Sequence, residues 1–157
     1  MNFLPEEIVA SRHFIRRVAH DIAHALGFSV ERMAALGMVA TRALCGRPVY
    51  VINTTRTVAV ARKHYGCAHI TGVVLDGDAD DGGTSHWRWR DAKDELMSAH
   101  SSGGTSSFGA YYTALTMAIF EDMGVYRAQW GTEEPMKWGR DAGCTFLEHE
   151  CTEHNAI

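Results

Sequence analysis

The spacing of apolar residues predicts a helix over the first part of the chain, ending near Leu26. Its apolar positions recur at the three- and four-residue intervals that mark one face of a helix. They are Ile8, Ile15, Val18, Ala19, Ile22 and Leu26. Asn2 can cap this helix, Pro5 suits its first turn, and Gly27 is a typical stop. We therefore expect residues 1–27 to form one helix with its apolar residues on one side.

Later segments predict a mixture of helices and short strands. Residues 48–53 are β-branched and aromatic, which favours a strand, and residues 70–75 form a second extended piece. Thr54 or Thr55 can cap a helix that runs to about Tyr65.

Residues 108–123 predict a strong helix, with an apolar stripe typical of a core-facing element. The stripe consists of Tyr112, Leu115, Ile119 and Met123. Residues 29–37 are compatible with a short helix, the stretch from there to Gly46 remains open as loop or helix, and residues 124–157 are turn-rich. The expected fold is mainly α with short β segments, an α+β chain.

Composition limits the function classes without choosing one. The chain has 157 residues, 46% of them hydrophobic, which suits one domain with a real core. A net charge of −4 does not favour binding to nucleic acid. The longest apolar run is too short to span a membrane.

The cysteines allow disulfides in an oxidising compartment. There are four, an even number, at Cys45, Cys67, Cys144 and Cys151, and the three pairings they allow cannot be separated. His64 and His69 flank Cys67, but a helix end with one half of a disulfide is favoured there over a metal site.

A pair of histidines is the strongest chemical signal. His20 and His24 are four residues apart, so on a helix their imidazoles lie one turn apart on the same face and can share one metal ion. The zincin motif HExxH uses this spacing for zinc and places a Glu between the histidines as general base. Here Asp21 holds the base position, one methylene shorter. Two such histidines are by themselves more often surface residues, and the chance that they bind a metal rises because Gly27 follows. A compact metzincin motif would put its third ligand at Val30, which cannot bind a metal.

The segment HDIAHALGFS resembles the HEMAHALGFS helix of the leishmanolysin family, a metzincin branch of surface zinc proteases with an insertion before the third histidine. The similarity continues along essentially the whole chain. It includes Pro48-Val49, Val51 to Asn53, Tyr65 to Cys67, Ser85 to Trp87, Asp94 to Met97, Tyr111 to Asp122, Trp138-Gly139 and Ala142 to Cys144.

The resemblance assigns roles to particular residues. His86 becomes the third zinc ligand beside His20 and His24, with one catalytic Zn²⁺ ion in an open site. Asp21 takes the catalytic position of the general base, and Met97 the methionine of the Met-turn. Gly27 supports the site by turning the chain.

The resemblance also divides the chain and implies a function. Residues 1–27 carry the active-site helix and 28–85 the family insertion. Residues 86–97 hold the third ligand and the Met-turn, 108–123 form a supporting helix, and 124–157 are the cysteine-containing end. The implied function is a zinc metalloendopeptidase acting on protein or peptide substrates at the cell surface or outside the cell.

Some family features are missing from the sequence as it stands. Its first and last residues predict neither a signal peptide nor an anchor signal. Only about twenty residues precede the motif, so we expect a partial metzincin-like core without most of the N-terminal sheet subdomain. With Asp21 in the base position, this leaves two alternatives: a catalytically inactive surface or adhesion protein of the same family, and a non-functional fragment.

Overall fold

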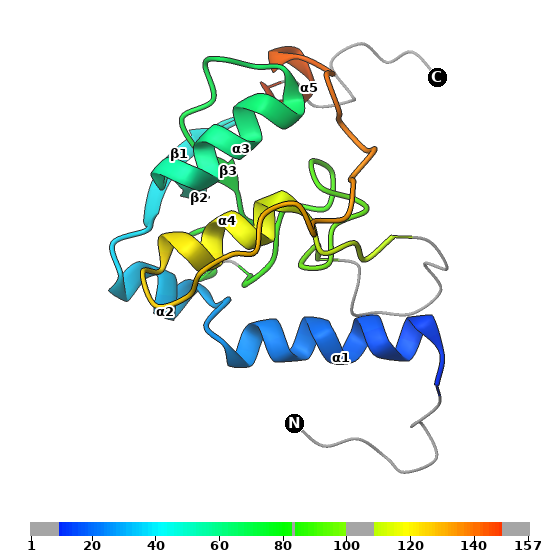
Figure 1. Ribbon diagram of the computed structural model, residues 1–157. Coiled ribbons are helices and arrows are strands. Elements are labelled where there is room, and N and C mark those ends of the chain that lie inside the picture. Colours follow the sequence, from blue (N-terminus) through cyan, green and yellow to red (C-terminus); the bar gives the residue numbers. More distant parts are fainter. Residues whose placement is uncertain (1–9, 83, 100–108, 149–157) are drawn as a thin grey trace.

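The computed structural model describes residues 10–82, 84–99 and 109–148, and shows the expected mixture of helices and strands (Figure 1). The elements in chain order are α1 (Arg12–Ala25), α2 (Val30–Ala35), β1 (Val39–Leu44), β2 (Arg47–Ile52), α3 (Thr55–Tyr65), β3 (Val73–Val74), α4 (Ala114–Asp122) and α5 (Cys144–Glu148). Helix α1 lies along one edge of the molecule, below α4 and the loops in Figure 1. The small sheet lies next to α3 at the far end from the start of α1.

Helix α1 begins later than the apolar pattern predicts. Its N-cap is Ser11, which has extended backbone angles and accepts a hydrogen bond from the backbone N–H of Phe14 at 3.1 Å. Because Ser11 is a good cap, the helix starts there, and the expected continuous helix from residue 1 is wrong. The caps predicted at Asn2 and Pro5 lie outside the described residues.

The apolar side of α1 is largely exposed. Ile15, Ile22 and Leu26 are 59%, 45% and 46% exposed, while the buried residues of the helix are His20 and Ala23. The periodicity correctly indicated a helix, but the histidine-bearing side faces inward. The consequence is an apolar stripe on the outside of α1.

The sheet has three antiparallel strands in the order β1, β2, β3. Strand β2 confirms the predicted extended segment, whereas β1 falls in a stretch that was left open as loop or helix. The tight turn between β1 and β2 uses Cys45 and Gly46, both with positive φ (50° and 78°). Two central residues with positive φ are the signature of a type I′ hairpin turn, which pairs the two strands directly.

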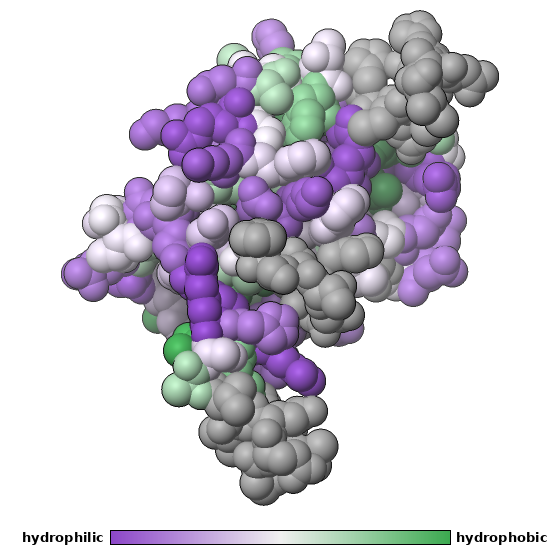
Figure 2. All heavy atoms as spheres, turned by 90° about the vertical axis from the view of Figure 1, so that its right-hand side faces the viewer, coloured by the Kyte–Doolittle hydropathy of each residue, from purple (hydrophilic) through white to green (hydrophobic). Residues whose placement is uncertain are grey.

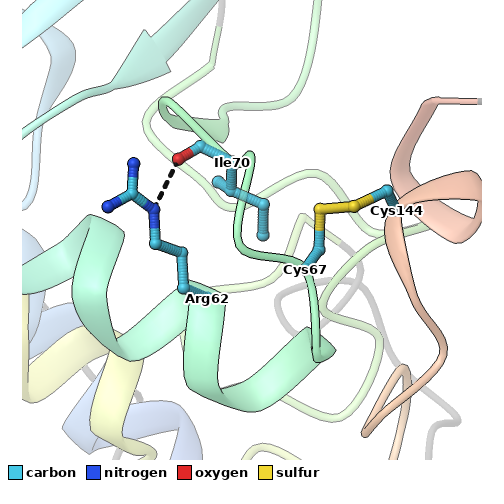
Figure 3. The surroundings of a disulfide bond; sticks show 4 residues. All are labelled: Arg62, Cys67, Ile70 and Cys144. Carbon is cyan, nitrogen blue, oxygen red and sulfur yellow. Dashed lines mark hydrogen bonds between the residues drawn. A yellow bond between two sulfur atoms is a disulfide. The ribbon is translucent and has the colours of Figure 1, made fainter.

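Helix α3 matches its prediction at both ends, with Thr54 as N-cap and Gly66 as a left-handed C-cap. A disulfide between Cys67 and Cys144 ties the end of α3 to the start of α5, and Arg62 donates a hydrogen bond to the Ile70 carbonyl at 2.9 Å (Figure 3). The disulfide pairs Cys67 with Cys144, a pairing that the sequence left open, and confirms Cys67 as half of a disulfide.

Helix α4 is the central core element. It begins after Thr113, later than the expected residue 108, because Tyr111, two residues before Thr113, pairs with Glu95 in a β-bridge. Six successive residues, Leu115 to Phe120, are buried. The predicted stripe therefore underestimated its burial: α4 is covered on nearly all sides, and it packs against α3.

Figure 2 shows one face on which hydrophilic side chains dominate and apolar ones form small patches. Within the described residues, every helix is too short or too polar to cross a membrane.

Candidate metal centre

Helix α1 supplies two of the three histidines. His20 and His24 are one turn apart, and the last turn of the helix closes with the hydrogen bonds of a Schellman motif. In that motif the N–H of Gly27 bonds the carbonyl of His24 at 3.0 Å, and the N–H of Phe28 bonds the carbonyl of Ala23 at 3.0 Å. Gly27 has φ 118°, which a residue with a side chain rarely adopts, so the turn depends on a glycine at this position.

The turn at Gly27 also orients His24. It brings the Phe28 carbonyl oxygen 2.8 Å from Nδ1 of His24. A carbonyl only accepts, so Nδ1 carries the proton and donates it, and the Nε2 lone pair is left for another partner. His20 is held in the same way, because its Nδ1 donates to the Leu96 carbonyl at 2.7 Å.

The third histidine comes from the distant segment that follows β3. The carbonyl of His86 accepts the N–H of Asp76 at 2.9 Å, and the next residue, Trp87, pairs with Leu75. Ser85, just before it, accepts the N–H of Val30 at 3.0 Å, which ties this segment to the first residue of α2. The insertion therefore folds back and returns His86 to α1.

The three Nε2 atoms form a nearly equilateral triangle. The distance from His20 to His24 is 3.0 Å, and His86 lies 3.2 Å from each. In a tetrahedral zinc site with Zn–N bonds of about 2.0–2.1 Å, neighbouring nitrogens are about 3.3 Å apart. The donor set and its spacing thus fit one zinc ion held by three imidazoles.

The electrostatics of the centre favour neutral imidazoles. Burial is the main cause that lowers the pKa of His20. Burial, followed by the neighbouring His20 and His24, lowers the pKa of His86 to about 4. A neutral imidazole keeps a free lone pair, which is the form that binds metals.

The remaining predicted residues occupy different surroundings. Met97 is fully buried, and its carbonyl accepts the N–H of Trp87 at 2.8 Å, so the predicted Met-turn lies beside the His86 segment. Asp21 is half-buried on α1 and lies between His20 and His24 in the sequence. Its role as general base remains a prediction.

Sequence reasoning missed the groups that orient the histidines. The carbonyls of Phe28 and Leu96 are backbone atoms, and no side-chain pattern reveals them. Glu95 was also missed, because it follows the charged residues Asp91, Lys93 and Asp94 and nothing in the local sequence marks it as buried. It is fully buried, which raises its pKa to about 7, while hydrogen bonds from Thr116, Met97 and Thr113 act in the opposite direction.

The fold and site define a helix-borne three-histidine centre suited to a transition metal such as zinc. The sequence model of the leishmanolysin family (Peptidase_M8) matches residues 1–157, and the chain belongs to this family of zinc metalloproteases.

Curated relatives agree with this membership. The chain is 43% identical to a leishmanolysin homolog of Crithidia fasciculata over 97% of its length, which is 23% of the relative. It is 40% identical to leishmanolysin of Leishmania tropica, again over 97% of this chain and 23% of the relative. A leishmanolysin-like peptidase of Drosophila pseudoobscura pseudoobscura is 28% identical over 96% of the chain and 28% of the relative. The chain thus spans about a quarter of the length of these proteins.

Proposed function

We propose that this chain is the zinc-holding part of a leishmanolysin-type metalloendopeptidase with a metzincin-like core. The observation that carries the proposal is the triangle of Nε2 atoms from His20, His24 and His86, with edges of 3.0 to 3.2 Å. Two of these rings are fixed through Nδ1 by backbone carbonyls, as is usual for histidine ligands. When bound, zinc supplies a Lewis acid and lowers the pKa of its water ligand toward neutrality.

Asp21 takes the part of the general base. Its carboxylate accepts a proton from the attacking water and passes it to the leaving amine of the substrate. The shorter side chain reaches less far than Glu, and a misplacement of about 1 Å can cost on the order of 100-fold in rate. We therefore expect zinc binding with slow peptide cleavage.

The remaining roles follow the family. Gly27 turns the chain after the ligand helix, Met97 lies beneath the centre, and peptides or proteins are the substrates. The Cys67–Cys144 disulfide favours an oxidising compartment, in keeping with a cell-surface or extracellular location.

A second candidate is a zinc-binding member of the family without turnover, acting as a surface or adhesion protein. The observation that favours it is Asp21 at the position where the family has Glu. Retained zinc without cleavage distinguishes this candidate from a peptidase.

Replacement of the base tests the two candidates. Asp21→Glu in the purified, zinc-loaded protein is expected to raise the cleavage rate of an unstructured protein substrate about 10-fold or more, because the carboxylate regains its reach. Asp21→Ala is the matched control, expected to keep zinc and abolish cleavage. Peptide cleavage is followed by mass spectrometry and zinc content by atomic absorption. An unchanged rate in a folded, zinc-loaded Asp21→Glu variant would show that Asp21 does not limit the reaction.

A further inference from the structure

A buried carboxylate lies directly beside the carbonyl that holds His20. Glu95 is 0% exposed, although acidic side chains are almost never fully buried without partners. The next residue, Leu96, provides the oxygen that accepts the Nδ1–H of His20 at 2.7 Å. The proposed reaction does not use the Glu95 carboxylate, so its burial has another cause.

Both oxygens of this carboxylate accept hydrogen bonds. Oε2 accepts the backbone N–H of Met97 at 2.5 Å. Oε1 accepts the backbone N–H and the hydroxyl of Thr113 at 3.3 and 2.9 Å. The Thr116 side chain is a further hydrogen-bond partner of Glu95. These partners all donate toward Glu95, which suits a carboxylate because a carboxylate only accepts.

The same contacts join the segments that build the centre. Thr113 is the N-cap of α4, so Glu95 fastens its own segment to the main core helix. The Thr116 hydroxyl also accepts the Nε1–H of Trp87 at 3.2 Å, and Trp87 directly follows His86. One carboxylate is therefore linked to the α4 core, to the His86 segment and to the carbonyl that orients His20.

We infer that Glu95 is a positioning residue of the three-histidine centre. It fixes residues 95–97 between α4 and the His86 segment, and thereby aims the Leu96 carbonyl at Nδ1 of His20. This inference rests on the proposed function, since it assumes that the three histidines hold zinc. Residues that orient the ligands of a metal typically change its affinity 10- to 100-fold when they are replaced.

The test compares two carboxylates at opposite ends of α4: Glu95 contacts its N-cap, and Asp122 is its last residue. Glu95→Gln keeps the size of the side chain but turns an NH2 group toward N–H and O–H donors. Asp122→Asn is the matched control, because Asp122 lies at the far end of α4 and bonds α3 rather than the centre. The zinc dissociation constant is measured by competition with a chromophoric chelator. The visible spectrum of the Co²⁺ form reports the ligand geometry.

We expect Glu95→Gln to weaken zinc binding about 10-fold or more and to alter the Co²⁺ bands, and Asp122→Asn to leave both within about twofold of the parent. A parent that does not bind zinc would refute the proposed function, and the inference with it. If the parent binds zinc and Glu95→Gln binds it equally well, the inference alone is wrong. Equal losses in the two variants would also overturn it, because they would indicate general destabilisation.

A second pair of variants decides the matter if Glu95→Gln does not fold. Thr116→Val removes the hydroxyl between Trp87 and Glu95 with little change in shape, whereas Thr116→Ser keeps it. We expect a several-fold loss of zinc affinity only in Thr116→Val. Equal zinc affinity in these two variants would overturn the inference.

Discussion

Helix α1 and the start of α4 both contact the segment around Leu96, yet the two helices are held in different ways. Helix α4 buries six successive residues, Leu115 to Phe120, and is fixed by apolar packing. The buried residues of α1 are His20 and Ala23. Polar contacts also attach α1, such as the ion pair of Arg16 with Glu134 and the hydrogen bond of His20 to the Leu96 carbonyl.

This difference means that the proposed metal ligands of α1 are also side chains that hold the helix to the rest of the molecule. The side chains that turn inward are the proposed ligands, while apolar residues such as Ile22 and Leu26 line an open groove beside Phe120 and Tyr126. Metal binding should therefore stabilise α1 much more than α4.

Removal of the metal should have the largest effect on stability, and it should affect α1 far more than α4. A zinc ion held at a free concentration 1,000 times its dissociation constant stabilises a protein by about 4 kcal/mol, and that contribution is absent from His86→Ala. We expect a loss of this size in the free energy of unfolding, and a loss of hydrogen-exchange protection concentrated in the amides of α1. Chemical denaturation and exchange mass spectrometry, with and without a chelator, measure the two effects.

His64→Ala is the matched control for that experiment. His64 is also half-buried, and burial is the main cause that lowers its pKa, but it contacts the Trp138 carbonyl and not the centre. It should keep zinc and the protection of α1. Equal loss of protection in α1 and α4 on chelation would mean that the metal does not act through α1.

Truncation of one apolar side chain in each helix should change the unfolding free energy less than removal of the metal, and by different amounts in α1 and α4. Leu115→Ala in α4 removes a side chain that is 1% exposed and should cost about 3 kcal/mol of unfolding free energy, through lost burial and a cavity. Ile22→Ala in α1 removes one that is 45% exposed and should change it by less than about 0.5 kcal/mol. Denaturant melts of the zinc-loaded proteins measure the unfolding free energies of the parent and the two variants. A cost for Ile22→Ala near that of Leu115→Ala would show that the outer face of α1 is packed against something.

The fold was predictable where local chemistry determines it. Helix α3 begins after Thr54 and ends at Gly66, as expected. The end depends on the residue itself, because Gly66 adopts the left-handed conformation that glycine favours. Strand β1 was missed because its pairing with β2 is a contact between segments, and its residues include the charged Arg42. The apolar spacing indicated helix α1 but not its buried side, which carries His20 and Ala23.

The site was predictable in part for the same reason. The spacing of His20 and His24 is a property of any helix, so their proximity followed from the sequence. That His86 meets them came only from the family resemblance, since the chain between must fold back. The orienting carbonyl of Leu96 and the buried Glu95 depend on how α4 packs, which no local pattern contains.

The smallest predicted effect concerns the far end of α4. The Asp122 carboxylate accepts the backbone N–H groups of Arg56 and Thr57 at 3.3 and 2.9 Å, and so caps α3 in place of Thr54, whose side chain makes no capping bond. Burial by itself would raise the pKa of Asp122, but the hydrogen bonds that it accepts, including those from Arg56 and Thr57, outweigh burial and lower it.

The sign of the pH effect follows from the lowered pKa. The folded protein holds Asp122 ionised more firmly than the unfolded chain does, so the stabilisation is fully present above the ordinary pKa of Asp, about 3.9. It is lost as the pH falls through the lower value of the folded state. Loss of a helix cap costs about 1 kcal/mol, so Asp122→Asn should be less stable than the parent by about that amount at pH 7 and by less at pH 3. Urea melts at both pH values measure this difference. A gap between the two proteins that stays constant with pH would show that Asp122 acts through its shape, and that its charge contributes nothing to joining α3 and α4.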